Sequence, residues 1–419
     1  MSDVLQLTSL CNRSAVPVLS QPQLVYVLTE LLPGQGVSNV RLPVNFALVL
    51  DRSGSMAGEK LRTMKEAVKN IIDQLEPTDI ISIVAFETKT HTLVHAQPAT
   101  NKLDLKHQVD RIEDGGGTNM APGLREGLSL VSQYHNPERV SRIILLTDGE
   151  ATDKEAESRK VADHAGETGI PIVGLGFGKD WKHEFLIDLA DRSLLAPGTQ
   201  TGYTDYIPTP KDAFKIFQEV YKSMQVVAQE VTVTMRMSQG LEARRVWQVV
   251  PMIRDIGSGA IQGRAVVIQL SELEKGGTAY LTEMMLPPRP AGAVRIAQTE
   301  ASYNVPNRGP QREAVDLVVQ FLTDPTAAAQ YNGKVMNIVE RVQAFKLQTQ
   351  ALDEAEGGNV GGATQKLRAA VTILLSQGET DLANQMQQEA DRLEKSGQMS
   401  DESKKTIKLT SRKTVRLSD

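Results

Sequence analysis

The stretch that decides the fold is NFALVLDRSGSM, residues 45–56. It begins with an apolar run over residues 46–50, which is typical of a strand buried on both faces of a parallel sheet. The run stops at Asp51 and passes into a loop of small hydroxyl residues. Ligands of open α/β sheets bind just beyond the carboxyl ends of such strands, so Asp51, Ser53 and Ser55 lie where a site is expected. Oxygen-bearing side chains on alternate residues suit a hard divalent cation such as Mg2+.

Two further segments carry the same kind of side chain. Residues 142–147 form a second apolar run, which ends on Asp148. Between the two runs lies a glycine-rich loop, GGGTN, over residues 115–119. Its backbone can approach other groups closely and present the Thr118 hydroxyl. We therefore expect two strand ends and one loop to bring their oxygen atoms together.

These pieces resemble the metal-ion-dependent adhesion site of the von Willebrand factor type A domain, which has Asp-x-Ser-x-Ser, then a lone Thr, then Asp. The matching positions follow the family's order and are Asp51, Ser53, Ser55, Thr118 and Asp148. The resemblance implies that the three hydroxyls supply neutral oxygens to Mg2+, Mn2+ or Ca2+, and that the aspartates act partly through water or orient the hydroxyls. A dication with mostly neutral protein ligands attracts a foreign anion. The expected ligand is therefore a Glu or Asp side chain of a partner protein.

The motif residues also have a purely structural interpretation. The aspartates could be strand-end caps and the serines ordinary turn residues. We favour the metal site because five positions match in order, and two of them stand at the ends of separate apolar strands. Three neighbours, Arg52, Met56 and Asn119, are candidates for contact with a partner, although ordinary loop polarity also explains Asn119.

A metal with aspartates also suggests a metal-dependent hydrolase. The sequence, however, has no His close to the motif, no His-Glu-x-x-His and no Gly-x-x-x-x-Gly-Lys-Ser/Thr loop. No nucleophile is paired with a base. We therefore predict a non-enzymatic binding module. The resemblance allows a further alternative, an adaptor for an AAA-type ATPase, because cytoplasmic type A domains often partner such machines; it predicts nucleotide-sensitive complexes.

Length and composition bound the class of protein. The chain has 419 residues, of which 40% are hydrophobic, with a net charge of −5 and one cysteine, Cys11. This length suits about two to four domains. The negative charge argues against general nucleic-acid binding, and a single cysteine permits no intramolecular disulfide. Residues 1–40 lack a signal-peptide pattern, and no apolar run approaches about 20 residues, so we expect a cytoplasmic protein without a membrane span.

The spacing of hydrophobic residues changes along the sequence and divides the chain into segments. Strands and helices alternate over residues 44–227, which predicts a doubly wound, mostly parallel sheet. Residues 228–306 change to a period of two and read as all-β. With the strands of residues 1–43 they are expected to form one discontinuous β-sandwich into which the α/β unit is inserted, an arrangement that the resemblance to some bacterial proteins with this module also implies. The alternative is a separate β-domain with an N-terminal arm.

The last part of the chain is expected to be helical. Residues 308–397 read as a bundle of helices, beginning with a helix over residues 311–323. The tail, residues 398–419, is basic and contains Ser and Thr. A disordered end is the simple interpretation. However, Thr406 and Thr414 each precede a Leu by three residues, which resembles the phosphothreonine ligands of forkhead-associated domains, so the tail could also be a phosphorylated docking peptide.

Overall fold

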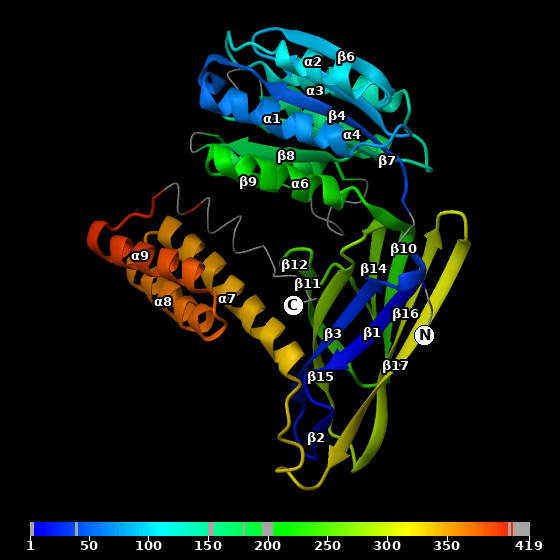
Figure 1. Cartoon of the computed structure of the whole chain (residues 1–419). Coiled ribbons are helices and arrows are strands. Elements are labelled where there is room, and N and C mark those ends of the chain that lie inside the picture. Colours follow the sequence, from blue (N-terminus) through cyan, green and yellow to red (C-terminus); the bar gives the residue numbers. More distant parts are fainter. Residues whose placement is uncertain are drawn as a thin grey trace. The chain divides into compact units, whose positions relative to one another are not determined.

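The computed structural model describes residues 4–37, 41–149, 155–178, 181–194, 204–400 and 404. The chain divides into two compact units (Figure 1). One is Val40–Val227, and the other combines Met1–Asn39 with Ala228–Asp419. Among the helices of these described residues, none has both the length and the apolar character that crossing a membrane requires.

The first unit is built on one twisted sheet. Its described strands are β4 (Val44–Asp51), β5 (Ile80–Phe86), β6 (Thr90–Pro98), β7 (Val140–Thr147), β8 (Ile172–Phe177) and β9 (Thr204–Ile207). They lie in the order β6-β5-β4-β7-β8-β9, and every pair is parallel except β5 with β6. Strands β4, β5 and β8 are buried along their whole length, as continuous apolar runs require. The predicted doubly wound, mostly parallel sheet is thus confirmed.

Helices cover both faces of this sheet. They are η2 (Gly54–Met56), α1 (Glu59–Gln74), α2 (Lys102–Asp110), α3 (Met120–Ser132), α4 (Glu155–Thr168), α5 (His183–Arg192), η3 (Pro210–Asp212) and α6 (Ala213–Ser223). Apolar residues of α1, α2 and α6 pack with Phe46, Leu48 and Leu50 in one core. Helix α3 packs on β4 from the other face, beside α4. Because β4 and β7 are neighbouring parallel strands, their carboxyl ends lie side by side at the same edge of the sheet.

The second unit contains two further sheets. One has the order β1-β3-β15-β11-β12, and the other has the order β13-β14-β10-β16-β17-β2. The strands of the first are β1 (Leu5–Cys11), β3 (Gln23–Pro33), β11 (Glu242–Val250), β12 (Arg254–Gly257) and β15 (Thr278–Leu286). Those of the second are β2 (Ala15–Pro17), β10 (Val226–Met237), β13 (Ile261–Gln262), β14 (Ala265–Glu274), β16 (Gly292–Val305) and β17 (Gly309–Leu322). A short turn of helix, η1 (Gln35–Val37), follows β3.

Strands that precede the α/β unit pair with strands that follow it. Strand β3 is antiparallel to β15, with Leu28 opposite Leu281, and β2 is parallel to the end of β17. The two sheets touch where the Ser9 hydroxyl on β1 donates a hydrogen bond to Thr299 Oγ1 on β16, at 2.9 Å. The chain thus leaves this unit for the α/β unit and returns to it.

Three helices of the described chain complete the second unit: α7 (Gly333–Glu356), α8 (Val360–Ser376) and α9 (Thr380–Ser396). They share a core of their own, and the first turns of α7 pack Val335 and Ile338 against a sheet through Trp247. Lys346 of α7 reinforces this contact, because its Nζ lies 2.5 Å from Glu283 Oε1 and 4.6 Å from the centre of the Trp247 ring. The predicted C-terminal helical domain is confirmed from residue 333 onward.

The predicted helix over residues 311–323 is wrong. This segment is strand β17, the partner of β16 in a long hairpin, so the helical part does not begin at residue 308. Its apolar residues fit a period of 3.6, but Leu317, Val319 and Phe321 also alternate with exposed residues, and this second pattern is the one that the fold uses. Pairing with β16 decides between the two patterns.

Candidate metal centre

Asp51 is the last residue of β4 and is fully buried. Its Oδ1 accepts a hydrogen bond from the Ser53 backbone N–H at 2.8 Å, and its Oδ2 accepts one from the Thr147 hydroxyl at 2.5 Å. Burial raises the pKa of Asp51, while the bonds from Thr147 and Ser53 lower it and the charge of Asp148 raises it again, leaving it above its ordinary value. Two buried carboxylates at one strand edge favour the presence of a cation.

The hydroxyls of the motif form a connected row. Ser53 Oγ and Ser55 Oγ lie 3.1 Å apart, and Ser55 Oγ donates to Asp148 Oδ1 at 2.8 Å. Ser55 stands in the single turn η2, directly after β4, whereas Asp148 follows the last residue of β7. The row therefore links the ends of two neighbouring parallel strands.

Thr118 joins the same group of side chains and is buried. A Cβ atom placed on Gly149 would lie 3.5 Å from Thr118 Oγ1 and 3.8 Å from Ser55 Oγ. Both hydroxyls therefore face the backbone just after Asp148. The structure brings together the five residues of the motif from three separate parts of the chain.

The glycine loop is fixed to the motif loop through backbone hydrogen bonds. Gly115 N donates to Arg52 O at 2.9 Å, and Gly54 N donates to Gly116 O at 3.2 Å. Gly116 has a φ of +66°, and a Cβ at this position would collide with the carboxylate of Glu87. The left-handed φ favours glycine at this position of the loop that carries Thr118.

The donor set fits a small hard dication. Octahedral Mg2+ holds oxygens at about 2.1 Å, which places neighbouring ligands about 3 Å apart. The 3.1 Å between Ser53 Oγ and Ser55 Oγ has this spacing. Within the described residues, no three His, Cys, Asp or Glu side chains gather as an alternative metal site. The fit thus rests on hydroxyls backed by two carboxylates.

Lys60 is a site residue that sequence reasoning missed. It lies in the first turn of α1, and its Nζ is 2.5 Å from Asp148 Oδ2. Asp148 thereby accepts from Ser55 on one oxygen and from Lys60 on the other. The only signal in the sequence was the position of Lys60 five residues after the motif, which does not reveal its charge partner.

The three predicted neighbours differ in what they can contact. Arg52 is half-buried, and its guanidinium donates to Glu113 O at 2.7 Å and pairs with Glu87 at 3.4 Å. Asn119 is partly exposed, and its backbone N–H donates to Glu87 O at 2.7 Å. The prediction that Met56 contacts a partner is wrong, because its side chain is fully buried in the core under α1. The turn η2 directs this apolar side chain inward.

Two other features fall outside the candidate centre. Thr406 and Thr414 lie outside the described residues, so phosphorylation of the tail and binding to a forkhead-associated domain stay predictions.

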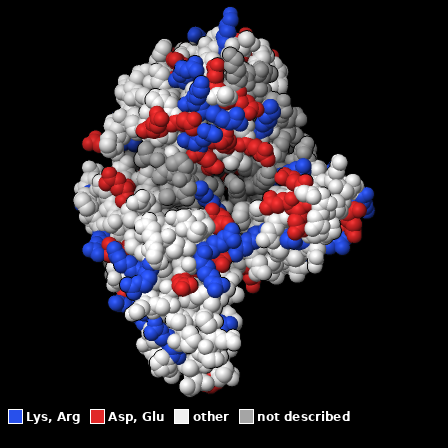
Figure 2. Space-filling view, turned by 180° about the vertical axis from the view of Figure 1, so that it is seen from behind, with Lys and Arg blue, Asp and Glu red and all other residues white. Residues whose placement is uncertain are grey.

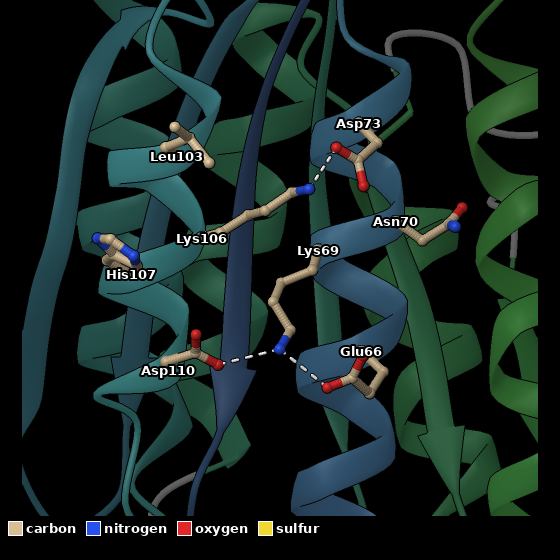
Figure 3. Close-up of a pocket in the computed structure, with 8 residues that line it drawn as sticks. All are labelled: Glu66, Lys69, Asn70, Asp73, Leu103, Lys106, His107 and Asp110. Atoms are coloured by element: carbon tan, nitrogen blue, oxygen red, sulfur yellow. Dashed lines mark hydrogen bonds and ion pairs between the residues drawn. The ribbon is translucent and has the colours of Figure 1, made fainter.

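A hollow of about 400 Å3 lies between α1 and α2 (Figure 3). Lys69 bridges Glu66 and Asp110 there, and Lys106 and Asp73 form a second pair. The two lysines offset two of the three carboxylates there, and on the face in Figure 2 both signs are interspersed over the α/β unit.

Comparison with known proteins identifies two parts of the chain. Residues 45–201 match the model of the von Willebrand factor type A domain. The chain contains a type A domain. Residues 333–417 match the model of the Sll0103-like, C-terminal alpha-helical domain, which begins where α7 begins. The resemblance drawn from the motif is thereby confirmed at the level of the domain.

Relatives match either most of the chain or about a third of it. The uncharacterized protein sll0103 of Synechocystis sp. is 26% identical over 388 residues, which is 90% of this chain and 89% of that protein. Human inter-alpha-trypsin inhibitor heavy chain H3 is 34% identical over 161 residues, which is 36% of this chain and only 18% of that protein. The second likeness therefore concerns a minor part of that protein.

Two solved structures share the fold. The von Willebrand factor type A protein from Catenulispora acidiphila has a TM-score of 0.74 and 19% identity, and covers 99% of this chain and 98% of that one. The ArnB paralog VWA2 from Sulfolobus acidocaldarius has a TM-score of 0.55 and 16% identity, and covers 98% of each chain. At these identities the likeness concerns the fold.

Proposed function

We propose that the type A domain is a metal-dependent protein-binding module that holds Mg2+ and, through it, an acidic side chain of a partner protein. The observation that supports this most directly is the hydrogen-bonded row of Ser53, Ser55 and Asp148 beside buried Asp51. In this proposal the neutral hydroxyl oxygens would surround the ion, with the carboxylates behind them.

The residues take distinct roles in this proposal. Ser53, Ser55 and Thr118 would hold the ion with their hydroxyl oxygens. Asp51 and Asp148 orient these groups, since Asp51 accepts the Ser53 N–H and Asp148 accepts the Ser55 hydroxyl. A bound Mg2+ would supply a Lewis acid to which a carboxylate oxygen can bind. Mn2+ and Ca2+ also prefer oxygen ligands, so the ion itself is open to measurement.

A single coordinated carboxylate is a directional anchor and does not make a whole interface. Stable recognition needs a larger buried surface around such an anchor. Arg52 and Asn119 adjoin the motif and are partly exposed, so both are candidates for this surrounding contact. No residue of the site is proposed to act as a nucleophile or a general base.

Affinity capture from native lysate tests the proposal. The full chain, Thr118→Ala and Thr118→Ser serve as baits, each with Mg2+ and with EDTA. We expect partners on the wild-type chain and on Thr118→Ser with Mg2+, release by EDTA, and loss on Thr118→Ala. Equal capture by Thr118→Ala, unaffected by EDTA, would contradict the proposal. Repeating the capture with ATP tests the adaptor alternative, because it requires a co-purifying ATPase whose binding responds to nucleotide.

A further inference from the structure

A lysine ammonium group already lies at the candidate centre. Lys60 Nζ is 2.5 Å from Asp148 Oδ2, and the Asp148 side chain is fully buried while that of Lys60 is 30% exposed. A Cβ placed on Gly178, just after β8, would lie 3.6 Å from both Cε and Nζ of Lys60. The ammonium group is therefore held beside the ends of β7 and β8 and does not extend freely into solvent.

This ammonium changes the charge balance of the site. Asp51 and Asp148 together with Lys60 leave one negative charge in excess, and a bound dication turns this into one positive charge in excess. Arg52 does not alter the sum, because it is paired with Glu87. Without Lys60 the two carboxylates alone would balance the dication. Among the described residues at the motif, Lys60 thus decides whether the metal-loaded site is neutral or cationic.

We propose that Lys60 makes the metal-loaded site select an anionic ligand. This rests on the proposed metal-dependent function and assigns the preference for a carboxylate to one side chain. Lys60 opposes binding of the metal alone, because two cations then share the same carboxylates. A carboxylate from outside removes the excess positive charge. Metal and carboxylate therefore strengthen one another's binding, and by linkage the factor is the same in both directions.

A purely structural role for Lys60 leads to different behaviour. If Lys60 only held α1 against the end of β7, its replacement would loosen the site and weaken metal binding. The proposal instead requires two opposite changes: tighter binding of the metal alone and a smaller effect of carboxylate upon it. This split separates the two roles.

The experiment is calorimetric titration of the full chain with Mn2+ in three solutions: buffer alone, buffer with acetate and buffer with acetamide. The measured affinities are corrected for the association of Mn2+ with acetate in the buffer. Acetate supplies a carboxylate, and acetamide is a neutral molecule of similar shape. The variants are Lys60→Gln, Lys60→Met and Lys60→Arg. Lys65→Gln is the matched control, since it removes the same charge from the same helix, where Lys65 donates to the Asp110 carbonyl at 2.9 Å. Thermal unfolding without metal verifies that each variant is folded.

For wild type, Lys60→Arg and Lys65→Gln, we expect acetate but not acetamide to tighten Mn2+ binding. In Lys60→Gln and Lys60→Met, Mn2+ alone binds roughly tenfold more tightly, and the acetate effect shrinks by a similar factor. Unchanged or weaker Mn2+ binding in these two folded variants, or an undiminished acetate effect, overturns the inference. Failure of wild type to bind Mn2+ at all overturns the proposed function itself, which is a distinct result.

Discussion

Ser55 donates a hydrogen bond to Asp148 at 2.8 Å, across 93 positions of the sequence. A second bond, from the Thr147 hydroxyl to Asp51 at 2.5 Å, crosses the same two strand ends in the opposite direction. The loop after β4 and the end of β7 are thus joined by two side-chain hydrogen bonds, both made by protein groups alone. These two bonds fix the positions of Asp51, Ser55 and Asp148 relative to one another.

The Ser55–Asp148 bond leads to a prediction for metal binding. Ser55→Ala removes a hydroxyl ligand and leaves Asp148 Oδ1 without this donor in a buried position. We expect Mn2+ affinity to fall by roughly 10- to 100-fold. Calorimetric titration measures this change. Ser132→Ala is the control, because the Ser132 hydroxyl donates to the carbonyl of Leu128 within α3 and should leave the affinity unchanged. Equal affinities of Ser55→Ala and wild type would remove Ser55 from the ligand set.

The site could be predicted from sequence to the extent that strand ends determine it. Asp51 and Asp148 directly follow apolar runs of buried strands, so their meeting follows from the parallel order of the sheet. Lys60 could not be found in this way, because its partner Asp148 is 88 positions away and nothing near Lys60 marks the contact. Met56 was misplaced because sequence proximity to the motif does not tell which way a side chain points after a tight turn.

The fold was predictable wherever only one period fitted the sequence. In β17 two periods fitted, and the helical one was preferred although the strand was correct. The sequence did contain a local signal, because Asn and Gly are typical of hairpin turns. Asn307 and Gly309 both have positive φ and connect β16 to β17 as a hairpin. The pairing of β17 with β16 cannot be read from the hydrophobic pattern of residues 311–323 alone.

Close packing of α3 on β4 predicts a stability effect. A Cβ on Gly127 would lie 2.6 Å from Val49 Cγ2, so Gly127→Ala must displace the buried Val49 side chain, the helix or the strand. We expect the α/β unit to lose about 1–3 kcal/mol in its free energy of unfolding. Urea unfolding followed by Trp181 fluorescence in a Trp247→Phe background reports on this unit. Gly115→Ala is the control, since no atom lies within 4 Å of its added Cβ; equal stability of both variants would contradict the packing.

An ion pair between a buried carboxylate and a partly exposed lysine couples α7 to the sheet of β3. Glu30, whose side chain is 3% exposed, accepts from Lys334 at 2.8 Å and from Thr8 at 3.2 Å. Lys334→Met leaves the Glu30 carboxylate buried without its charge partner. We expect the free energy of unfolding to fall by about 2 kcal/mol. This loss is smaller than that for a fully buried ion pair, because Lys334 is partly exposed. Adding Glu30→Gln should restore most of it. Urea unfolding followed by Trp247 fluorescence in a Trp181→Phe background checks both; no recovery in the double variant would argue against an unpaired-charge cost.

Asp188 gives a prediction for pH. Burial acts to raise its pKa, but hydrogen bonds from Arg159 at 2.6 Å and Arg192 at 2.8 Å lower it below its ordinary value. The folded state therefore binds this proton less readily than the unfolded state. Its contribution to stability is present above about pH 4 and is lost as the pH falls through the lowered pKa. Thermal unfolding should show a shallower decline below pH 4 for Asp188→Asn than for wild type, and parallel curves would contradict this.

The central claim is that Ser53, Ser55 and Thr118 hold a divalent cation at the carboxyl ends of β4 and β7. Anomalous diffraction from crystals grown with Mn2+ tests it most directly. We expect one strong anomalous peak within coordination distance of these three hydroxyl oxygens, with Asp51 and Asp148 around it. Ordinary solvent density at this position, with Mn2+ bound elsewhere or not at all, would contradict the claim.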